Sequence, residues 1–283
     1  MPLRLLHLAG SALGILTYRA SSAYRLHLDA NLRQAGYADR ATRTAAIREA
    51  GKAIAELPAV WLRPPDAVAR LVVETRGWEH IDAAHAASRP IIFLTPHLGC
   101  FEITAQIYAH RAPADKPITV LYRRPRKAAL TPLIESGRGR PNMKLASADF
   151  AGVRALIRAL RRGEAAGLLP DQTPRLGEGV WAPFFAKPAY TMTLVRRLVR
   201  AGDAVMLLAF AERLPRGRGY RLSVRPFEAP LSSDMTAAVT QINSALETLI
   251  RECPAQYLWS YDRYRVPAGR EDNDAAVPRT NSE

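Results

Sequence analysis

The residues best suited to chemistry in this chain are a histidine and a carboxylate, His97 and Glu102. Residues Pro90 to Thr95 are typical of a buried strand, and Pro96 ends that strand before a helix begins. Two side chains five positions apart on one helix are separated by roughly 140° about the helix axis, which is too far for them to meet on one face. The pair therefore converges only if His97 lies in the turn and Glu102 in the first turns of the helix.

Such a turn suits His97 for general-base catalysis. Pro96 and Gly99 provide the break, because proline restrains the preceding residue and glycine permits unusual backbone angles. A helix N-terminus favours the neutral imidazole that a base needs, and a carboxylate on the other ring nitrogen stabilises the imidazolium formed on proton transfer. The structural alternative is a histidine satisfied by local hydrogen bonds.

Cys100 offers a different chemistry in the same segment, a cysteine and histidine nucleophile. A cysteine between Gly99 and Phe101 at a helix start is more often a small packed residue. No other feature of the sequence favours a covalent thiol enzyme, so we expect Cys100 to pack.

The elements that must position these residues alternate between strands and helices. Strands are expected at 71–75, 90–95, 117–122, 165–169, 205–210 and 220–224. Helices are expected at 40–61, 99–111, 126–136, 150–162, 190–201 and 234–252. This alternation predicts an α/β fold with a largely parallel mixed sheet flanked by helices, and reactive groups where strands end.

Two further polar pairs follow predicted strands. Arg123 and Arg124 come after one strand, and guanidinium groups bind phosphate in a bidentate manner. Asp171 and Gln172 come after another, where they are expected to hydrogen-bond an acceptor sugar or hold Arg123. The alternative for Arg123 and Arg124 is a solvated basic loop, and for Asp171 and Gln172 it is a turn cap. The basic patch is extended by Arg126, Lys127, Arg138 and Arg140.

Composition limits the class of protein. The 283 residues, 48% hydrophobic and 23% charged, allow one large domain or two small ones with a packed core, and argue against disorder. The two cysteines, Cys100 and Cys253, and the six histidines, the last of which is His110, predict no metal site, and no cofactor is expected.

The net charge of +14 implies an anionic partner: nucleic acid, a membrane surface, a phosphorylated lipid or an acidic protein. A GC-rich genome would account for the excess of arginine over lysine but not for the net charge.

The N-terminus carries an apolar run from Leu5 to Tyr18, 14 residues without a charged side chain, short of the ~20 that span a bilayer. We interpret residues 1–23 as an uncleaved helix lying in or dipping into the membrane, with Arg4, Arg19 and Arg25 near the headgroups. An ordinary core helix and a cleaved signal peptide are the alternatives. Residues 24–266 form the main domain, and residues 267–283 are expected to be a disordered tail.

Four segments in order resemble the conserved blocks of the bacterial lipid A biosynthesis late acyltransferases, within the wider glycerolipid acyltransferases. They are His97-x4-Glu102; Tyr122-Arg123-Arg124-Pro125; Leu169-Pro170-Asp171-Gln172 with Gly179-Val180 and Pro183-Phe184-Phe185; and Pro254-x-Gln256-Tyr257-Leu258-Trp259. The resemblance covers about residues 5 to 267.

This resemblance implies an acyltransferase at the cytoplasmic face of the inner membrane. The acyl chain would move from an acyl carrier protein thioester to a hydroxyl of a lipid A precursor of the Kdo-lipid IVA type, a phosphorylated glycolipid. His97 would remove the hydroxyl proton, Glu102 would orient the ring, and backbone amides of residues 98–100 would hold the oxyanion. Arg123, Arg124, Asp171 and Gln172 would bind substrate.

Three departures from the family pattern affect the acceptor side: Ala186, Ala255 and the pair Tyr261-Asp262. An acyltransferase acting on an ornithine lipid, a mannosylated lipid or an aryl polyene is therefore the alternative. A basic nucleic-acid-binding protein is the alternative from another class, but the arginines are spread along an α/β chain without a known nucleic-acid-binding motif, so no nucleic acid is expected as a partner.

Overall fold

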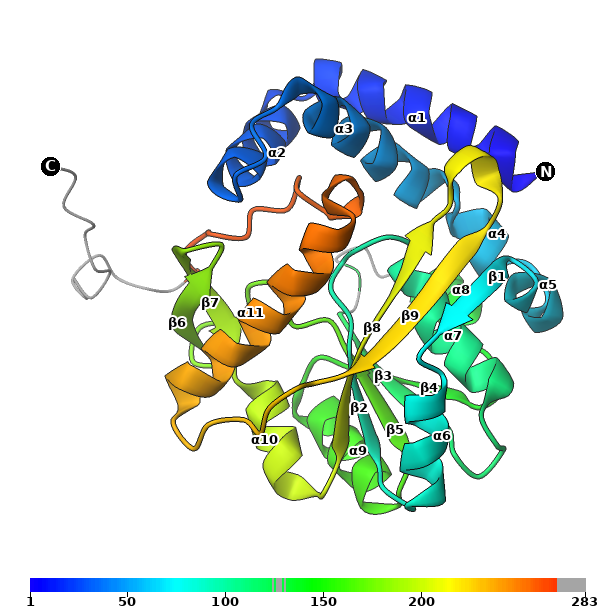
Figure 1. The fold of residues 1–283 in the computed structure, drawn as a ribbon, viewed down its shortest axis with the longest axis vertical. Helices are drawn as coiled ribbons and strands as arrows, with labels where there is room; N and C mark the ends of the chain where they lie inside the picture. The colour runs from blue at the N-terminus through cyan, green and yellow to red at the C-terminus, as the bar shows by residue number, and fades with distance from the viewer. Residues whose placement is uncertain (124, 126–128, 130, 269–283) are drawn as a thin grey trace, which may run out of the picture.

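The computed structural model describes residues 1–268 except 124, 126–128 and 130 (Figure 1). Its centre is a seven-stranded sheet in the order β1-β9-β8-β2-β5-β3-β4. The strands are β1 Val72–Arg76, β2 Ile91–Leu94, β3 Ile118–Tyr122, β4 Met143–Ser147, β5 Ala165–Leu168, β8 Val205–Arg213 and β9 Tyr220–Pro226. Neighbours from β8 to β4 are parallel, whereas β9 runs antiparallel to β8 and pairs in parallel with β1. The expected largely parallel mixed sheet is confirmed.

Helices surround this sheet. The first five are α1 Leu3–Ala20, α2 Ser22–Gln34, α3 Arg40–Ala55, α4 Leu57–Trp61 and α5 Pro65–Ala69. They are followed by α6 Glu79–Ala86, α7 Phe101–Arg111, α8 Thr131–Arg138, α9 Phe150–Arg161, α10 Leu194–Ala201 and α11 Met235–Glu252. A separate hairpin of β6 Gly179–Phe184 and β7 Lys187–Met192 packs against α11. Within the described residues, no helix is long and apolar enough to span a membrane.

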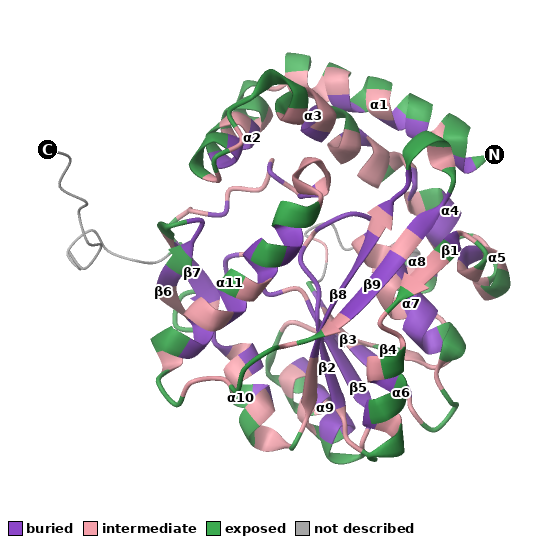
Figure 2. Cartoon of the chain, in the orientation of Figure 1, coloured by how far each residue is buried: buried purple, intermediate pink, exposed green. Residues whose placement is uncertain are grey.

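Side chains alternate along the central strands and so build two cores. On β2, Ile92 and Leu94 belong to the core that α9, α10 and α11 complete, whereas Ile91 and Phe93 belong to the core under α6 and α7. This is the two-residue period of a strand buried on both faces. Figure 2 shows the central strands buried and the outer faces of the helices exposed.

Helix α1 crosses α3 at very short range because three glycines meet there. A Cβ atom on Gly51 would lie 2.0 Å from the Gly10 carbonyl oxygen and 2.4 Å from the Gly14 nitrogen. Next to this crossing, His7 of α1 is buried against Glu56, with 3.2 Å between Nε2 and Oε2. Arg213, at the end of β8, donates to the same carboxylate.

The sequence missed three strands and three helices. Strands β4, β6 and β7 and helices α2, α5 and α6 were not expected, and the segment 190–201, expected to be one helix, divides into the end of β7 and α10. Tyr190 and Thr191 pair with β6 across the hairpin, so tertiary pairing overrides the local apolar pattern. Helix α8 begins at Thr131, and part of the segment 126–136 lies outside the described residues.

Candidate active site

His97 lies in the loop between β2 and α7, and Asp171 follows the neighbouring strand β5. Because β2 and β5 are parallel, their carboxyl ends bring the two residues together. The Asp171 carboxylate accepts two hydrogen bonds from His97, one from ring Nδ1 at 2.7 Å and one from the backbone amide at 2.8 Å. One carboxylate thus fixes both the ring and the loop that carries it.

The hydrogen bonds of His97 show which ring nitrogen carries the proton and which one accepts. Burial raises the pKa of Asp171, but the positive charge of His97 and its two hydrogen bonds outweigh burial, so the net shift of that pKa is downward. An ionised carboxylate only accepts, and the Nδ1 position must therefore carry the proton. In the neutral ring Nε2 then has a free lone pair, which accepts a hydrogen bond from the Gln172 amide at 3.1 Å.

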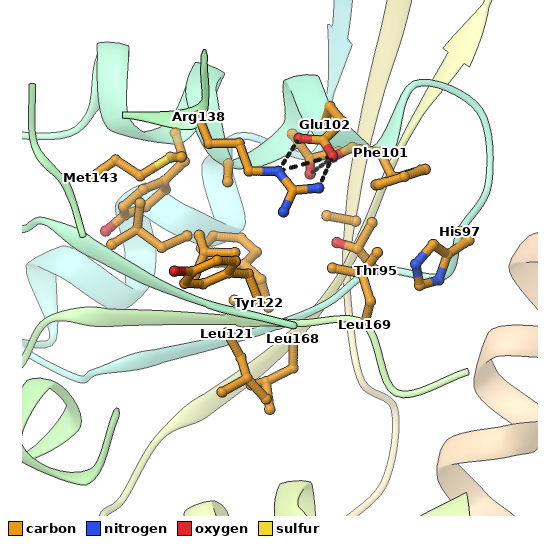
Figure 3. Close-up of a pocket in the computed structure, with 18 of the residues that line it drawn as sticks. Thr95, His97, Phe101, Glu102, Leu121, Tyr122, Arg138, Met143, Leu168 and Leu169 are labelled. Carbon is orange, nitrogen blue, oxygen red and sulfur yellow. Dashed lines mark hydrogen bonds and ion pairs between the residues drawn. The ribbon is translucent and has the colours of Figure 1, made fainter. Parts of the chain in front are cut away.

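Glu102 lies at the first turn of α7, as expected, but it does not bind the His97 ring. Its carboxylate forms a bidentate ion pair with Arg138 of α8 (Figure 3). It also accepts a hydrogen bond from the Trp61 indole at 3.2 Å. The expectation that Glu102 orients His97 is corrected by this geometry: Asp171 occupies that position because it reaches Nδ1 from the adjacent strand, while Arg138 supplies a full positive charge to Glu102.

The backbone amides of the loop are already occupied. The amide of Leu98 donates to the Pro96 carbonyl at 2.7 Å and that of Cys100 to Ala211 at 2.8 Å. The amide of Gly99, a residue with φ of 59°, donates to the Gln256 carbonyl at 3.0 Å. The amides of residues 98–100, the expected oxyanion donors, are therefore committed to the fold.

The arginines expected to bind phosphate have different positions. Arg123 borders the cavity described below and donates weakly to the Thr173 carbonyl at 3.4 Å, so Asp171 does not hold it. Arg124 lies outside the described residues, as do Arg126 and Lys127. Arg140 is bound to backbone carbonyls of Val60 and Trp61 and to Gln106, which gives it a structural role.

A cavity of about 300 Å³ opens beside His97. Polar residues gather at one part of its wall: Thr95, His97, Glu102, Arg123, Arg138 and Gln172. The remainder runs between the sheet and helices α6 and α7 and is lined by apolar side chains, among them Trp78, Ile81, Phe93, Tyr108, Ala209, Leu222 and Val224. The site can therefore hold a long apolar group with its polar end next to the histidine.

Cys100 is packed, as expected. Its side chain is buried, and burial together with the nearby Glu56 carboxylate raises the pKa of the thiol well above its usual value. A thiol of this kind is a poor nucleophile because the reactive form is the thiolate. Phe184 and Phe185 pack into the core rather than line the cavity, and Trp181 lies on the β6 and β7 hairpin.

Two contacts of Glu102 escaped the sequence analysis, in addition to the pairing of His97 with Asp171. The pairing of Glu102 with Arg138 joins residues 36 positions apart, and Trp61 reaches the same carboxylate from α4. The available signal was the repeated Gly-Arg in the segment 137–140, because a glycine beside an arginine allows another element to pack close to the backbone there. A Cβ at Gly137 would lie 3.0 Å from Trp61, so this glycine permits the approach of α8 to α4.

Comparison with known proteins agrees with the resemblance. The family model described as bacterial lipid A biosynthesis acyltransferase matches residues 1–266. Among curated proteins of Escherichia coli K12, the lipid A biosynthesis lauroyltransferase is 28% identical over 218 residues, which cover 76% of this chain and 69% of the relative. The palmitoleoyltransferase is 27% identical, covering 79% and 71%, and the myristoyltransferase is 23% identical, covering 74% and 64%.

Proposed function

This chain belongs to the bacterial lipid A biosynthesis acyltransferase family and is an acyltransferase, and from that premise we propose the reaction and the residues that carry it. A fatty acyl chain moves from an acyl carrier protein thioester to a hydroxyl of a lipid A precursor of the Kdo-lipid IVA type. The observation that carries the proposal is His97, held by Asp171, at the polar end of a cavity with an apolar interior.

In this mechanism Nε2 of His97 takes the proton from the acceptor hydroxyl as its oxygen attacks the thioester carbonyl. Asp171 keeps the Nδ1 proton in place and stabilises the imidazolium that forms. When the tetrahedral intermediate collapses, the carbon–sulfur bond breaks and His97 returns the proton to the leaving thiolate. The products are the ester and the free thiol of the carrier, so atoms and charge balance without a metal or cofactor.

Side chains replace the occupied loop amides as donors to the oxyanion. Gln172 already directs its amide at the reacting nitrogen, and the acceptor hydroxyl would take that place and leave the amide close to the carbonyl oxygen. Arg138 borders the same cavity and its bonds to Glu102 use Nε and Nη2, which leaves Nη1 for a substrate oxygen. We assign Glu102 the role of positioning Arg138, because a bidentate pair fixes the plane of the guanidinium.

The apolar part of the cavity would receive the acyl chain of the donor. Its floor is formed by strands and by helices α6 and α7, where Ile81 and Leu222 are 1% and 2% exposed. Gly167 also lines it, and a Cβ there would meet Ile118 and Val120 at 3.4 Å, an ordinary contact distance. A methyl group at this position would therefore shorten the space without moving the walls.

Helix α1 supports association with the cytoplasmic face of the inner membrane. Its buried side holds Leu3, His7, Gly10 and Gly14, and its opposite side is apolar between two arginines. The exposed apolar residues of that side are Leu5, Leu8, Leu13 and Leu16, between 42% and 64% exposed. Such a face inserts into the headgroup region of a bilayer, where Arg4 and Arg19 meet anionic lipid.

The function is tested with the purified full chain in detergent, a series of acyl carrier protein thioesters, and Kdo-lipid IVA as acceptor. We expect one added acyl chain per acceptor by mass spectrometry, and none with His97→Ala. Transfer to an ornithine lipid but not to Kdo-lipid IVA would move the activity to the alternative acceptor class. Absence of transfer from every carrier-bound donor would overturn the proposed donor.

A further inference from the structure

An exposed basic face lies on two neighbouring helices, α9 and α10. It consists of Phe150, Arg154, Arg158, Arg161, Arg197 and Arg200. On α9 the spacing of four, four and three positions aligns the side chains along one side of the helix. In the described part of the chain, none of these five arginines forms an ion pair, whereas Arg162 beside them is held by Glu164. The face is thus a concentrated and unneutralised positive charge.

This basic face begins at the active site. Ala148, which lines the cavity, lies two residues before α9, and Met192, which also lines it, lies two residues before α10. At 1.5 Å per residue, Arg154 and Arg161 lie roughly 6 Å and 17 Å along the helix from Phe150. The charges therefore extend away from the cavity over about three turns of helix α9.

The aromatic residue at the cavity end is unusual in its exposure. Phe150 is 89% exposed, more than any other large apolar side chain in the described residues. Exposed aromatic and arginine side chains together are typical of the residues that dominate protein–protein binding. An aromatic ring at the start of a basic helix stripe is therefore suited to a protein partner with an acidic surface.

The position of this face separates it from the surface we assign to lipid. Helices α1 and α3 lie at one end of the long axis of the molecule, and α9 and α10 lie at the other (Figure 1). With the exposed leucines of α1 in a bilayer, the basic face is turned towards the aqueous side. Its partner is then soluble rather than a headgroup layer.

We propose that the basic face of α9 and α10 is the docking surface of the acidic acyl carrier protein that delivers the donor; this inference rests on the proposed function. Arginines meet the carboxylates of the carrier, Phe150 packs against an apolar residue of its surface, and the thioester arm enters the cavity beside Ala148 and Met192. Complementary charge of this kind acts mainly on the rate of encounter.

The test compares two variants with the same change in net charge. Arg154→Glu/Arg158→Glu reverses the basic face, and Arg40→Glu/Arg48→Glu reverses two exposed arginines of α3. We expect kcat/KM for a carrier-bound donor to fall about tenfold or more in the first variant and less than twofold in the second. With acyl-coenzyme A bearing the same chain, both variants are expected to stay within twofold of the wild type.

Three results would overturn the docking surface. Equal losses in both variants would mean that net charge alone matters, and an equal loss with acyl-coenzyme A would mean that the substitutions damage the catalytic machinery. If Arg154→Glu/Arg158→Glu leaves kcat/KM for the carrier-bound donor unchanged but sediments less with phosphatidylglycerol vesicles, the basic face binds lipid instead. If the wild type itself does not use a carrier-bound donor, the proposed function fails as well; if it does and the first variant equals it, only the docking surface fails.

Discussion

Two histidine and carboxylate pairs in this molecule share their chemistry but differ in their surroundings. His97 and Asp171 meet at the edge of the cavity, and the second ring nitrogen faces Gln172. His7 and Glu56 meet beneath α1, where both side chains are almost fully buried and His7 does not line the cavity.

The partners of the carboxylate account for the difference. Glu56 accepts bonds from Arg213 and from the Tyr220 hydroxyl at 2.9 Å, so a permanent cation already balances its charge. Asp171 has the histidine as its principal cationic neighbour, and a proton arriving on that ring is therefore stabilised directly. In the proposed mechanism the carboxylate of Asp171 stabilises the positive charge that forms on His97. The charge of Glu56 is already balanced by Arg213, so the pair of His7 and Glu56 serves the fold.

Removing the imidazole of His97, the proposed general base, should have the largest effect. His97→Ala is expected to lower acyl transfer by about 10²- to 10⁴-fold, because a positioned base contributes that much, and Asp171→Asn should approach the same loss. His7→Ala is the matched control and should retain transfer per folded molecule. Turnover at the wild-type rate by His97→Ala would contradict the mechanism.

Glu102 is expected to affect acyl transfer by positioning Arg138. Glu102→Gln and Arg138→Lys are each expected to lower kcat/KM by about 10- to 100-fold, since a misplaced group far from a bond change can cost 10²-fold. The double variant should lose little more than either single one, because both changes remove one interaction. If the losses in kcat/KM of the two single variants multiply in the double variant, Glu102 and Arg138 act separately.

Breaking the buried pair should affect stability before activity. Arg213→Met leaves the Glu56 carboxylate buried without its cation, and the free energy of unfolding is expected to fall by about 3–5 kcal/mol. Urea denaturation measures this loss. Replacing both members, as in Arg213→Met/Glu56→Gln, should recover part of it, and no recovery would mean that the hydrogen bond from Arg213 to the Gly99 carbonyl is the larger contribution.

Acid should distinguish the two pairs further. Burial raises the pKa of Glu56, but Arg213 and His7 outweigh it and hold the pKa at about 2, against an ordinary value of 4.5. The folded state thus binds this proton more weakly than the unfolded state, so the stabilisation is complete above pH 4.5 and is lost as the pH falls towards 2. Unfolding free energies measured between pH 6 and pH 3 should fall less steeply in Glu56→Gln.

The smallest effect is expected at Cys100. Cys100→Ala removes one buried sulfur atom and should cost about 1 kcal/mol of stability while kcat/KM stays within about twofold of the wild type. Wild-type chain treated with iodoacetamide should likewise remain active, since the thiol is buried and its pKa is raised. An inactive but folded Cys100→Ala would restore the thiol nucleophile.

Local sequence was sufficient for six of the seven strands of the central sheet and for the placement of His97 in the turn after β2. Pro96 and Gly99 identified the turn, and the apolar run before them identified β2. The partner of the ring was not readable, because Asp171 reaches it only through the pairing of β2 with β5, strands more than 70 residues apart. Sheet order is set by tertiary packing rather than by any local pattern.

The oxyanion prediction failed for a related reason. Amides at a helix start are free in an isolated helix, but here Gln256 and Ala211 arrive from distant parts of the chain to accept their hydrogen bonds. The hairpin of β6 and β7 was likewise hidden, since each strand gains its partner only across the turn. The family blocks supplied the identity of the reaction, which no periodicity in the chain contains.

The glycine crossing of α1 and α3 limits which helices could replace the N-terminal segment. With backbone atoms of Gly10 and Gly14 against Gly51, a helix with any larger residue at these positions cannot dock, and the displaced helix would withdraw His7 from Glu56. An unrelated hydrophobic anchor therefore cannot be grafted in place of α1 without losing part of the interior. A replacement for α1 would have to keep small residues at positions 10 and 14 in order to fit against Gly51 of α3.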